Sequence, residues 1–368
     1  MKILFLTLNT FSLTGGVEKV GRAICKVLSD LQQDKKITSF NVLSVYDNKP
    51  DINYVSNTNF NGFKANKISF ATSTLSKSRA NNIVVLSHIN LLVFGWLIKN
   101  LTSKKRIILI AHGIEVWHQL KNWKINFLQK HCEIWAVSNF TANQLIRQGI
   151  PKERIKVLNN GLDPFFNPPK NFEKPTHLLK KYHLNTDQNI LFTLTRMSFL
   201  EQYKGYDQII ALIPQLLTKY PNLHYILAGK ADEMELERIK KLIKKLRIEQ
   251  KVTLTGFLQD EEVNDHYLLA DVFVMPSKGE GFGISFIEAA ACGCPSIAGN
   301  ADGSFDALLN GELGILIDPT NSTEIAKAIN ENLSEPKTKA LQNKLQQLSV
   351  AHFGYDQYKT KVFNLLYS

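Results

Sequence analysis

Short apolar runs alternate with amphipathic stretches along this chain, and the alternation occurs twice. Apolar runs bounded by polar or glycine residues are typical of strands in a buried parallel sheet, and the helical spacing between them is typical of the covering helices. In the first half the predicted strands are Lys2–Leu8, Ser39–Val45, Ile83–Ser87, Arg106–Ala111, Glu133–Val137 and Ile155–Leu158, and the helices include Val17–Leu31 and Asn139–Gln148. In the second half the strands are Ile190–Thr195, Leu223–Leu227, Val252–Thr255, Asp271–Met275, Pro295–Ala298 and Gly314–Ile317. The helices predicted between those strands are Tyr206–Lys219, Glu233–Leu246, Glu261–Leu269 and Thr323–Leu333.

This repeated order predicts an α/β fold with two doubly wound, Rossmann-like domains. A length of 368 residues is natural for two domains and long for one. The proline-rich stretch Asp163–Pro169 is interpreted as the linker between them. Because doubly wound sheets bind ligands at the carboxyl ends of their strands, we expect the site in a cleft between the two domains.

Composition favours a globular protein of a reducing, intracellular compartment. Hydrophobic residues make up 44% of the chain, and the four cysteines are too few and too scattered for a disulfide framework. The apolar start Met1–Leu8 is interpreted as the first strand and not as a signal peptide, because polar Asn9-Thr10 follows at once without a small-residue cleavage site. The run Leu91–Ile98 is too short to span a bilayer.

The excess of positive over negative charge lies in the first half of the chain. Residues 1–165 carry 22 of the 44 Lys and Arg residues but only 9 of the 33 Asp and Glu residues. A phosphorylated substrate, an anionic membrane surface or nucleic acid would each explain this excess, and so would a solvated lysine-rich surface. Nucleic acid is not expected as a partner, because no recognised nucleic-acid motif accompanies the charge.

The segment Ser277–Ala291 carries the most specific pattern in the chain. A predicted strand leads into a glycine-rich turn, and the residues that follow predict a helix that begins near Ile284. Gly281 and Gly283 allow a positive φ and a close approach of the backbone to a ligand. Because free N–H groups at a helix start attract negative charge, this turn predicts an anion site.

Two carboxylates, Glu280 and Glu288, stand eight residues apart in the same segment. A phosphate alone needs no carboxylates, whereas the hydroxyls of a sugar and a ribose donate hydrogen bonds to them. The pattern therefore suggests a site for a nucleotide sugar. An ordinary strand, turn and helix without a ligand is the alternative for this segment.

Residues at other predicted strand ends could complete such a site. The pair Gly15-Gly16 follows the first strand and could let a diphosphate approach the backbone, or it could be a plain tight turn. Arg196 and Lys204 follow the first strand of the second half and could neutralise a departing diphosphate, or they could be surface cations. His112 follows another strand and could donate to a sugar oxygen, or it could be structural.

Taken together, these residues resemble the retaining glycosyltransferases of family 4, and the resemblance covers nearly the whole chain. It is carried by Gly15-Gly16-Val17-Glu18, His112-Gly113, Asn160-Gly161-Leu162-Asp163, Arg196 with Lys204-Gly205, and the segment from Glu280 through Glu288. The resemblance implies the GT-B fold, with two Rossmann-like domains. It implies an acceptor-binding domain of residues 1–165 plus about 352–368, and a nucleotide-sugar-binding domain of residues 175–351.

The resemblance also implies a role for each residue. Glu280 would bind hydroxyls of the donor sugar, Glu288 the ribose, Arg196 and Lys204 the diphosphate, and His112 the transferred sugar. The implied donor-binding set is Gly15, Gly16, Arg196, Lys204, Glu280, Gly281, Phe282, Gly283, Ile284, Ser285 and Glu288. The implied catalytic set is Glu280, His112, Arg196 and Lys204. No covalent nucleophile stands out, and the resemblance suggests front-face attack with retention.

The sequence departs from the family pattern at residues 299–306, where Gly-Gly-x-Pro-Glu is common, so no role is carried over there. Residues 203–207 look most like the branch that adds mannose to polyprenyl-diphosphate-linked sugars, which favours GDP-mannose as the donor and a glycan or lipid-linked acceptor. The alternatives are a UDP-sugar-dependent glucosyl- or N-acetylglucosaminyltransferase, a nucleotide-sugar epimerase of the same fold, and a non-catalytic partner. No Asp-x-Asp motif occurs, which agrees with the metal-independent GT-B pattern that the resemblance implies, and neither a metal nor a cofactor is expected.

The stretch Lys121–Lys130 mixes Trp, Phe and Leu with three lysines. A helix of this composition could rest on an anionic leaflet, or it could pack its apolar side on the sheet. We therefore expect a cytoplasmic protein that associates peripherally with the inner face of the plasma membrane through its basic N-terminal domain. The stretch Tyr355–Leu366 is expected to cross back onto the first domain, as in the fold that the chain resembles.

Overall fold

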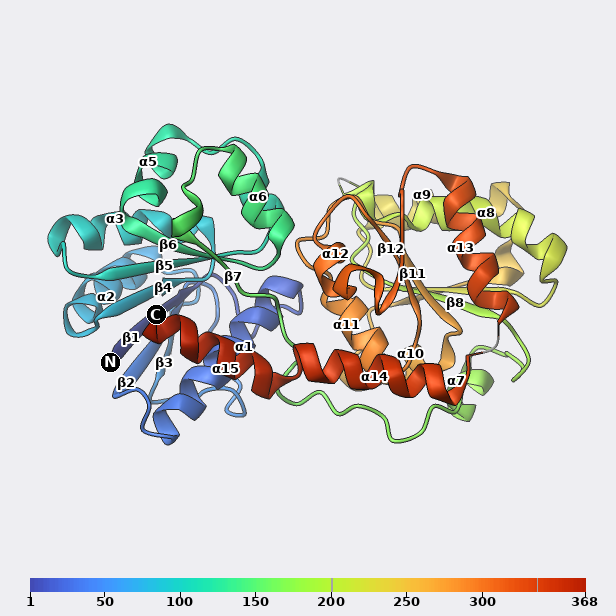
Figure 1. Cartoon of the computed structure of the whole chain (residues 1–368), viewed down its shortest axis with the longest axis horizontal. Coiled ribbons are helices and arrows are strands. Elements are labelled where there is room, and N and C mark those ends of the chain that lie inside the picture. The colour runs from blue at the N-terminus through green and yellow to red at the C-terminus, as the bar shows by residue number, and fades with distance from the viewer. Residues whose placement is uncertain (200, 336) are drawn as a thin grey trace. The chain divides into compact units, whose positions relative to one another are not determined.

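The computed structural model describes residues 1–199, 201–335 and 337–368 (Figure 1). The chain divides into two compact units. The first consists of Met1–Phe165 together with Phe353–Ser368, and the second is Phe166–His352. The proline-rich stretch at residues 163–169 contains the point at which the chain passes from one unit to the other.

The first unit is built on a seven-stranded parallel sheet in the order β3-β2-β1-β4-β5-β6-β7. Its strands are β1 Lys2–Thr7, β2 Ser39–Ser44, β3 Phe60–Gly62, β4 Ile83–Leu86, β5 Arg106–Ala111, β6 Cys132–Ala136 and β7 Ile155–Val157. Its helices are α1 Gly16–Gln33, α2 Lys67–Ala80, α3 Leu92–Leu101, α4 Ile114–Trp117, α5 Asn122–His131, α6 Asn139–Arg147 and α15 Tyr355–Tyr367. Apolar side chains of α2, α3, α5 and α6 form one buried cluster with the sheet.

The second unit is built on a six-stranded parallel sheet in the order β10-β9-β8-β11-β12-β13. Its strands are β8 Ile190–Leu194, β9 His224–Ala228, β10 Val252–Gly256, β11 Val272–Met275, β12 Ser296–Gly299 and β13 Gly314–Ile317. Its helices are α7 Thr176–Lys181, α8 Tyr206–Lys219, α9 Glu233–Lys245, α10 Asp260–Leu269, α11 Ile284–Ala291, α12 Ser304–Ala307, α13 Ser322–Ser334 and α14 Lys339–Phe353.

The predicted α/β class with two doubly wound parallel sheets is confirmed. Every predicted strand is present with ends shifted by about one residue, and the apolar start of the chain is the central strand β1. The short edge strand β3 was missed, because three residues are too few to show a pattern. The four cysteines are all free and buried.

The C-terminal helix α15 packs in the first unit beside α1 (Figure 1), which confirms that this stretch returns to the first domain. Arg106 holds its far end, because the guanidinium donates to the carbonyls of Leu365 and Leu366 and to both carboxylate oxygens of Glu133. At the near end, the N–H of Leu162 donates to the carbonyl of Phe353 at 2.7 Å.

We predict that Arg106→Lys lowers the free energy of unfolding by about 1–2 kcal/mol, because an ammonium cannot serve a carboxylate and two carbonyls with the same fork. The measurement is chemical denaturation followed by circular dichroism. Arg147→Lys, at an exposed position in the last turn of α6, is the matched control and should be neutral. Equal stability of the two variants would contradict this account of Arg106.

Candidate functional site

The turn that follows β11 has the predicted form. The helix α11 begins at Ile284, and Gly283 precedes it with φ = 92°, a conformation that favours glycine. The first N–H groups of an α-helix have no partner within the helix, so they are available to an anion placed before it. The predicted anion site therefore has the backbone that it requires.

Glu280, in this turn, is paired with Lys204. The Lys204 Nζ lies 2.5 Å from Oε1 of Glu280, and each side chain is only 14% exposed. Burial alone would lower the pKa of Lys204, but the charge of Glu280 outweighs it and the pKa is raised. The predicted sugar-binding carboxylate and the predicted diphosphate-binding cation thus lie together.

Arg196 is paired with a carboxylate that the sequence did not single out. Its guanidinium lies 2.5 Å from Glu201 and remains 68% exposed. Lys204 also lies over the ring of Tyr203, with its Nζ 5.0 Å from the ring centroid, and burial raises the pKa of Tyr203. Each of the two predicted site cations thus has a carboxylate partner, and Lys204 has an aromatic neighbour as well.

Asp302, in the loop between β12 and α12, was also missed. It is 1% exposed. Its carboxylate accepts the N–H of Glu280 at 2.6 Å and that of Ser304 at 2.9 Å. Burial, and then the charge of Glu280, raise its pKa to about 7. The signal available in the sequence was an Asp-Gly-Ser turn before a helix, in the segment that departs from the family pattern.

Glu288 lies on the buried side of α11. Glu288 is 3% exposed, and the Tyr267 hydroxyl donates to its Oε2 at 3.3 Å. Burial, followed by the charge of Glu288, raises the pKa of Tyr267 well above its usual value. Phe282 is buried, with 2% of the residue exposed. The ribose role of Glu288 stays a prediction.

In the first unit, the glycine pair opens the helix after β1. Gly16 is the first residue of α1, and a Cβ built on it would meet no atom within 4 Å. Gly15 precedes the helix with an ordinary extended φ of −76°. Gly16 therefore has open space beside it, whereas a Cβ on Gly15 would lie 2.5 Å from Oε2 of Glu18. Room for a close approach is thus shown at Gly16 alone.

Asp47 fixes the loop that leads to these glycines. It is 1% exposed, and it accepts the N–H groups of Thr10, Phe11 and Ser12 and the hydroxyl of Ser44. This role could not be predicted, because the aspartate lies after β2 and is distant in sequence from the loop.

His112 follows β5 and has a defined orientation. Its ring nitrogen Nε2 lies 2.7 Å from the carbonyl oxygen of Ser87, and its backbone N–H donates to the carboxylate of Glu115 at 2.6 Å. A carbonyl can only accept, so Nε2 carries the proton. In the neutral ring Nδ1 is then an acceptor, which suits a sugar hydroxyl better than the donor role that we expected.

The predicted residues thus fall into two groups, one in each unit. Gly15, Gly16 and His112 follow strands of the first sheet, and Arg196, Lys204 and Glu280 follow strands of the second. Each group lies at the carboxyl ends of its parallel strands, where doubly wound folds bind ligands. A shared cleft between the units stays a prediction.

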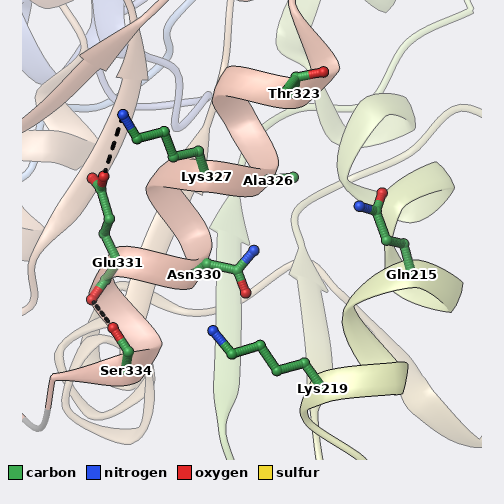
Figure 2. A pocket seen from close by; sticks show the side chains of 8 residues that line it. All are labelled: Gln215, Lys219, Thr323, Ala326, Lys327, Asn330, Glu331 and Ser334. Carbon is green, nitrogen blue, oxygen red and sulfur yellow. Dashed lines mark hydrogen bonds and ion pairs between the residues drawn. The ribbon is translucent and has the colours of Figure 1, made fainter.

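A separate groove lies between α8 and α13 (Figure 2). It encloses about 410 Å³, and Lys327 points toward Glu331 across 3.7 Å on its α13 side. Its lining is Gln215, Lys219, Thr323, Ala326, Lys327, Asn330, Glu331 and Ser334. None of these is a predicted site residue, so this groove is not the candidate site.

Within residues 1–199, 201–335 and 337–368, His, Cys, Asp and Glu side chains form no group of three placed to hold a metal ion. In the same part of the chain, no helix is both long enough and apolar enough to cross a bilayer.

Both units match known families. Residues 14–165 match the family described as Glycosyltransferase Family 4, and residues 176–347 match the one described as Glycosyl transferases group 1. With Anabaena HepE, solved in complex with UDP, the TM-score is 0.80 at 19% sequence identity, covering 100% of this chain and 99% of that one. This likeness confirms the predicted GT-B fold.

Curated relatives match over part of their length. The GDP-mannose-dependent alpha-(1-6)-phosphatidylinositol monomannoside mannosyltransferase of Mycolicibacterium smegmatis is 27% identical over 247 residues, 64% of this chain and 63% of that protein. The mannosylfructose-phosphate synthase of Agrobacterium fabrum is 35% identical over 185 residues, 48% of this chain and 39% of that one. The matches thus span less than two thirds of these relatives.

We predict that Glu280→Gln lowers the free energy of unfolding of the second unit by about 2–3 kcal/mol, because it leaves the buried Lys204 ammonium without its counter-charge. Chemical denaturation of Glu280→Gln, Lys204→Met and the double variant measures the coupling. Strictly additive losses would mean that the two charges do not stabilise one another.

Proposed function

We propose that this chain, which belongs to glycosyltransferase family 4, transfers a hexose from a nucleotide diphosphate sugar to an acceptor hydroxyl with retention at the anomeric carbon. The observation that carries the proposal is the ion pair between Lys204 and Glu280 before the start of α11, with Arg196 after the same strand as Lys204. Cations, a hydroxyl-binding carboxylate and free backbone N–H groups are what a sugar diphosphate requires.

The chemistry follows from where charge develops during transfer. As the sugar–phosphate bond breaks, negative charge grows on the departing diphosphate, and Lys204, Arg196 and the amides at Ile284 would stabilise it. For this the two cations exchange their carboxylate partners for phosphate oxygens, and Glu280 becomes free to accept sugar hydroxyls. The leaving phosphate takes the acceptor proton, so no protein nucleophile and no metal ion is required.

The first unit contributes groups of a different kind. Gly16 has open space for the diphosphate, and the Nδ1 of His112 can accept a hydrogen bond from the sugar. Closure of the two domains would exclude water and so limit hydrolysis of the donor.

GDP-mannose is our first candidate donor, with a glycan or lipid-linked acceptor in cell-surface polysaccharide or glycolipid synthesis. It is favoured by the relative from M. smegmatis, which is named as GDP-mannose-dependent. A UDP-sugar is the second candidate, because the similar HepE structure holds UDP. A thermal-shift comparison of GDP-mannose, UDP-glucose and UDP-N-acetylglucosamine separates the two, since only a bound donor stabilises the fold.

We predict that Glu280→Gln reduces transfer from the stabilising donor by about 10²–10³-fold, because the sugar and the departing charge lose one preorganised partner. The measurement is nucleotide release with and without acceptor, below the melting temperature of the variant. Glu237→Gln, at an exposed position on α9, is the control and should retain full activity. Conversion of the donor sugar by the wild type without any acceptor would instead indicate an epimerase.

We also propose that the first unit binds an anionic membrane surface. On the outer side of α3, Trp96 is 44% and Leu101 is 70% exposed. On α5, Trp123 is 40% exposed with Lys124 over its ring, whereas Phe127 and Leu128 are buried. The apolar side of α5 thus packs on the sheet, which is the alternative that the sequence left open for this helix. Outward tryptophans amid lysines suit a headgroup region.

We predict that the wild type floats with vesicles containing anionic lipid, that added salt releases it, and that Trp96→Ser with Trp123→Ser abolishes the binding. Met234→Ser, which removes an exposed side chain of the second unit, is the control and should float like the wild type. Absence of wild-type flotation at low salt would overturn membrane binding without affecting the transfer proposal.

A further inference from the structure

Two loops of the second unit are joined through the main chain of Glu280. The loop of residues 300–303 follows β12, and the loop of residues 276–283 follows the neighbouring strand β11. Asp302 accepts the N–H of Glu280, and the N–H of Gly303 donates to the carbonyl of Glu280 at 2.8 Å. Both backbone polar groups of Glu280 are therefore held by the other loop.

The two loops approach each other as closely as backbone allows. A Cβ built on Gly303 would collide with the carbonyl groups of Gly281 and Glu280. On the other side of Asp302, the N–H of Ser304 donates to its second carboxylate oxygen at 2.9 Å. One carboxylate thus bridges the turn that carries Glu280 and the start of α12.

Stability alone does not account for an aspartate at this position. Its pKa of about 7 lies well above the ordinary value of 3.8, because burial and the charge of Glu280 both oppose ionisation. A carboxyl whose pKa is raised on folding binds its proton more tightly in the folded state. The stability of the fold therefore falls as pH rises from about 4 to 7, and ionised Asp302 weakens the fold at neutral pH.

We propose that Asp302 is a positioning residue for Glu280, fixing the main chain from which the Glu280 side chain reaches the donor sugar. This inference rests on the proposed function, because it assigns Asp302 a part in the same site. The alternative is that Asp302 only joins two loops, with no effect on how Glu280 meets the sugar.

The ionisation of Asp302 links this role to pH. Charged groups on the surrounding elements are Glu280 and Lys278 in the 276–283 loop, Lys204 in the turn paired with Glu280, and Asp306 on α12. Ionised, the Asp302 carboxylate accepts strongly at both oxygens, whereas protonation leaves one oxygen a weaker acceptor. Below about pH 7 the hold on Glu280 loosens while the fold itself gains stability.

The variant Asp302→Asn tests the proposal, because an amide keeps the volume but offers only one oxygen to the two N–H donors. The first readout is hydrogen–deuterium exchange of the Glu280 amide, expected to be about tenfold faster than in the wild type. Asp187→Asn, at an exposed position of the same unit, is the control and should exchange like the wild type.

The second readout is the pH profile of kcat/KM with GDP-mannose or UDP-glucose, whichever stabilises the protein. We expect kcat/KM of the wild type to fall as pH is lowered through 7, although the stability of its fold rises over the same range. We expect kcat/KM of Asp302→Asn to be lower at every pH and to show no such fall. A folded variant with wild-type exchange, activity and pH profile overturns the proposal. A variant whose Glu280 amide exchanges faster, but whose activity and pH dependence of kcat/KM equal those of the wild type, also overturns the proposal.

If Asp302→Asn does not fold, the wild type alone decides. Protection of the Glu280 amide, corrected for the intrinsic exchange rate, should fall as pH is lowered from about 8 to about 6, and constant protection overturns the proposal. A wild type inactive with every donor, but with this pH-dependent protection, would count against the proposed function and leave the hold on Glu280 standing.

Discussion

Buried aspartates that accept backbone N–H groups are the interaction on which both halves of the candidate site depend. Loops at the carboxyl ends of parallel strands leave amides without sheet or helix partners, and such groups are costly unless an acceptor is supplied. Asp47 supplies it to three successive amides before the glycine pair, and Asp302 supplies it to Glu280 and to Ser304. In each domain, one buried carboxylate thus holds irregular backbone in place.

The charges nearer the proposed donor follow a second rule. Lys204 and Arg196 each lie against a glutamate, so the buried Lys204 has a counter-charge, whereas Arg196 remains largely exposed. In the proposed transfer a diphosphate would take the place of these carboxylates beside the cations. Its binding would then depend on the difference between two favourable pairings, and Glu280 would become available to accept sugar hydroxyls.

The sequence predicted what local patterns determine. Helix α8 runs over Tyr206–Lys219 as expected, and α11 begins at Ile284, because apolar spacing and glycine placement act within a few residues. It could not predict the pairing of Lys204 with Glu280, which are 76 residues apart and meet only because β8 and β11 are neighbours. Asp47 and Asp302 were missed for a related reason, since each serves backbone from another part of the chain.

The packing of α15 in the first unit makes that unit discontinuous in sequence, whereas Phe166–His352 is one uninterrupted stretch. During synthesis the second unit has all its residues before the first has its own. Arg106 must therefore wait for Leu365 and Leu366, and the side of α1 that α15 contacts stays uncovered in the meantime. A domain whose sheet is synthesised before the second unit is thus completed after it, and surface exposed during that interval favours misassembly.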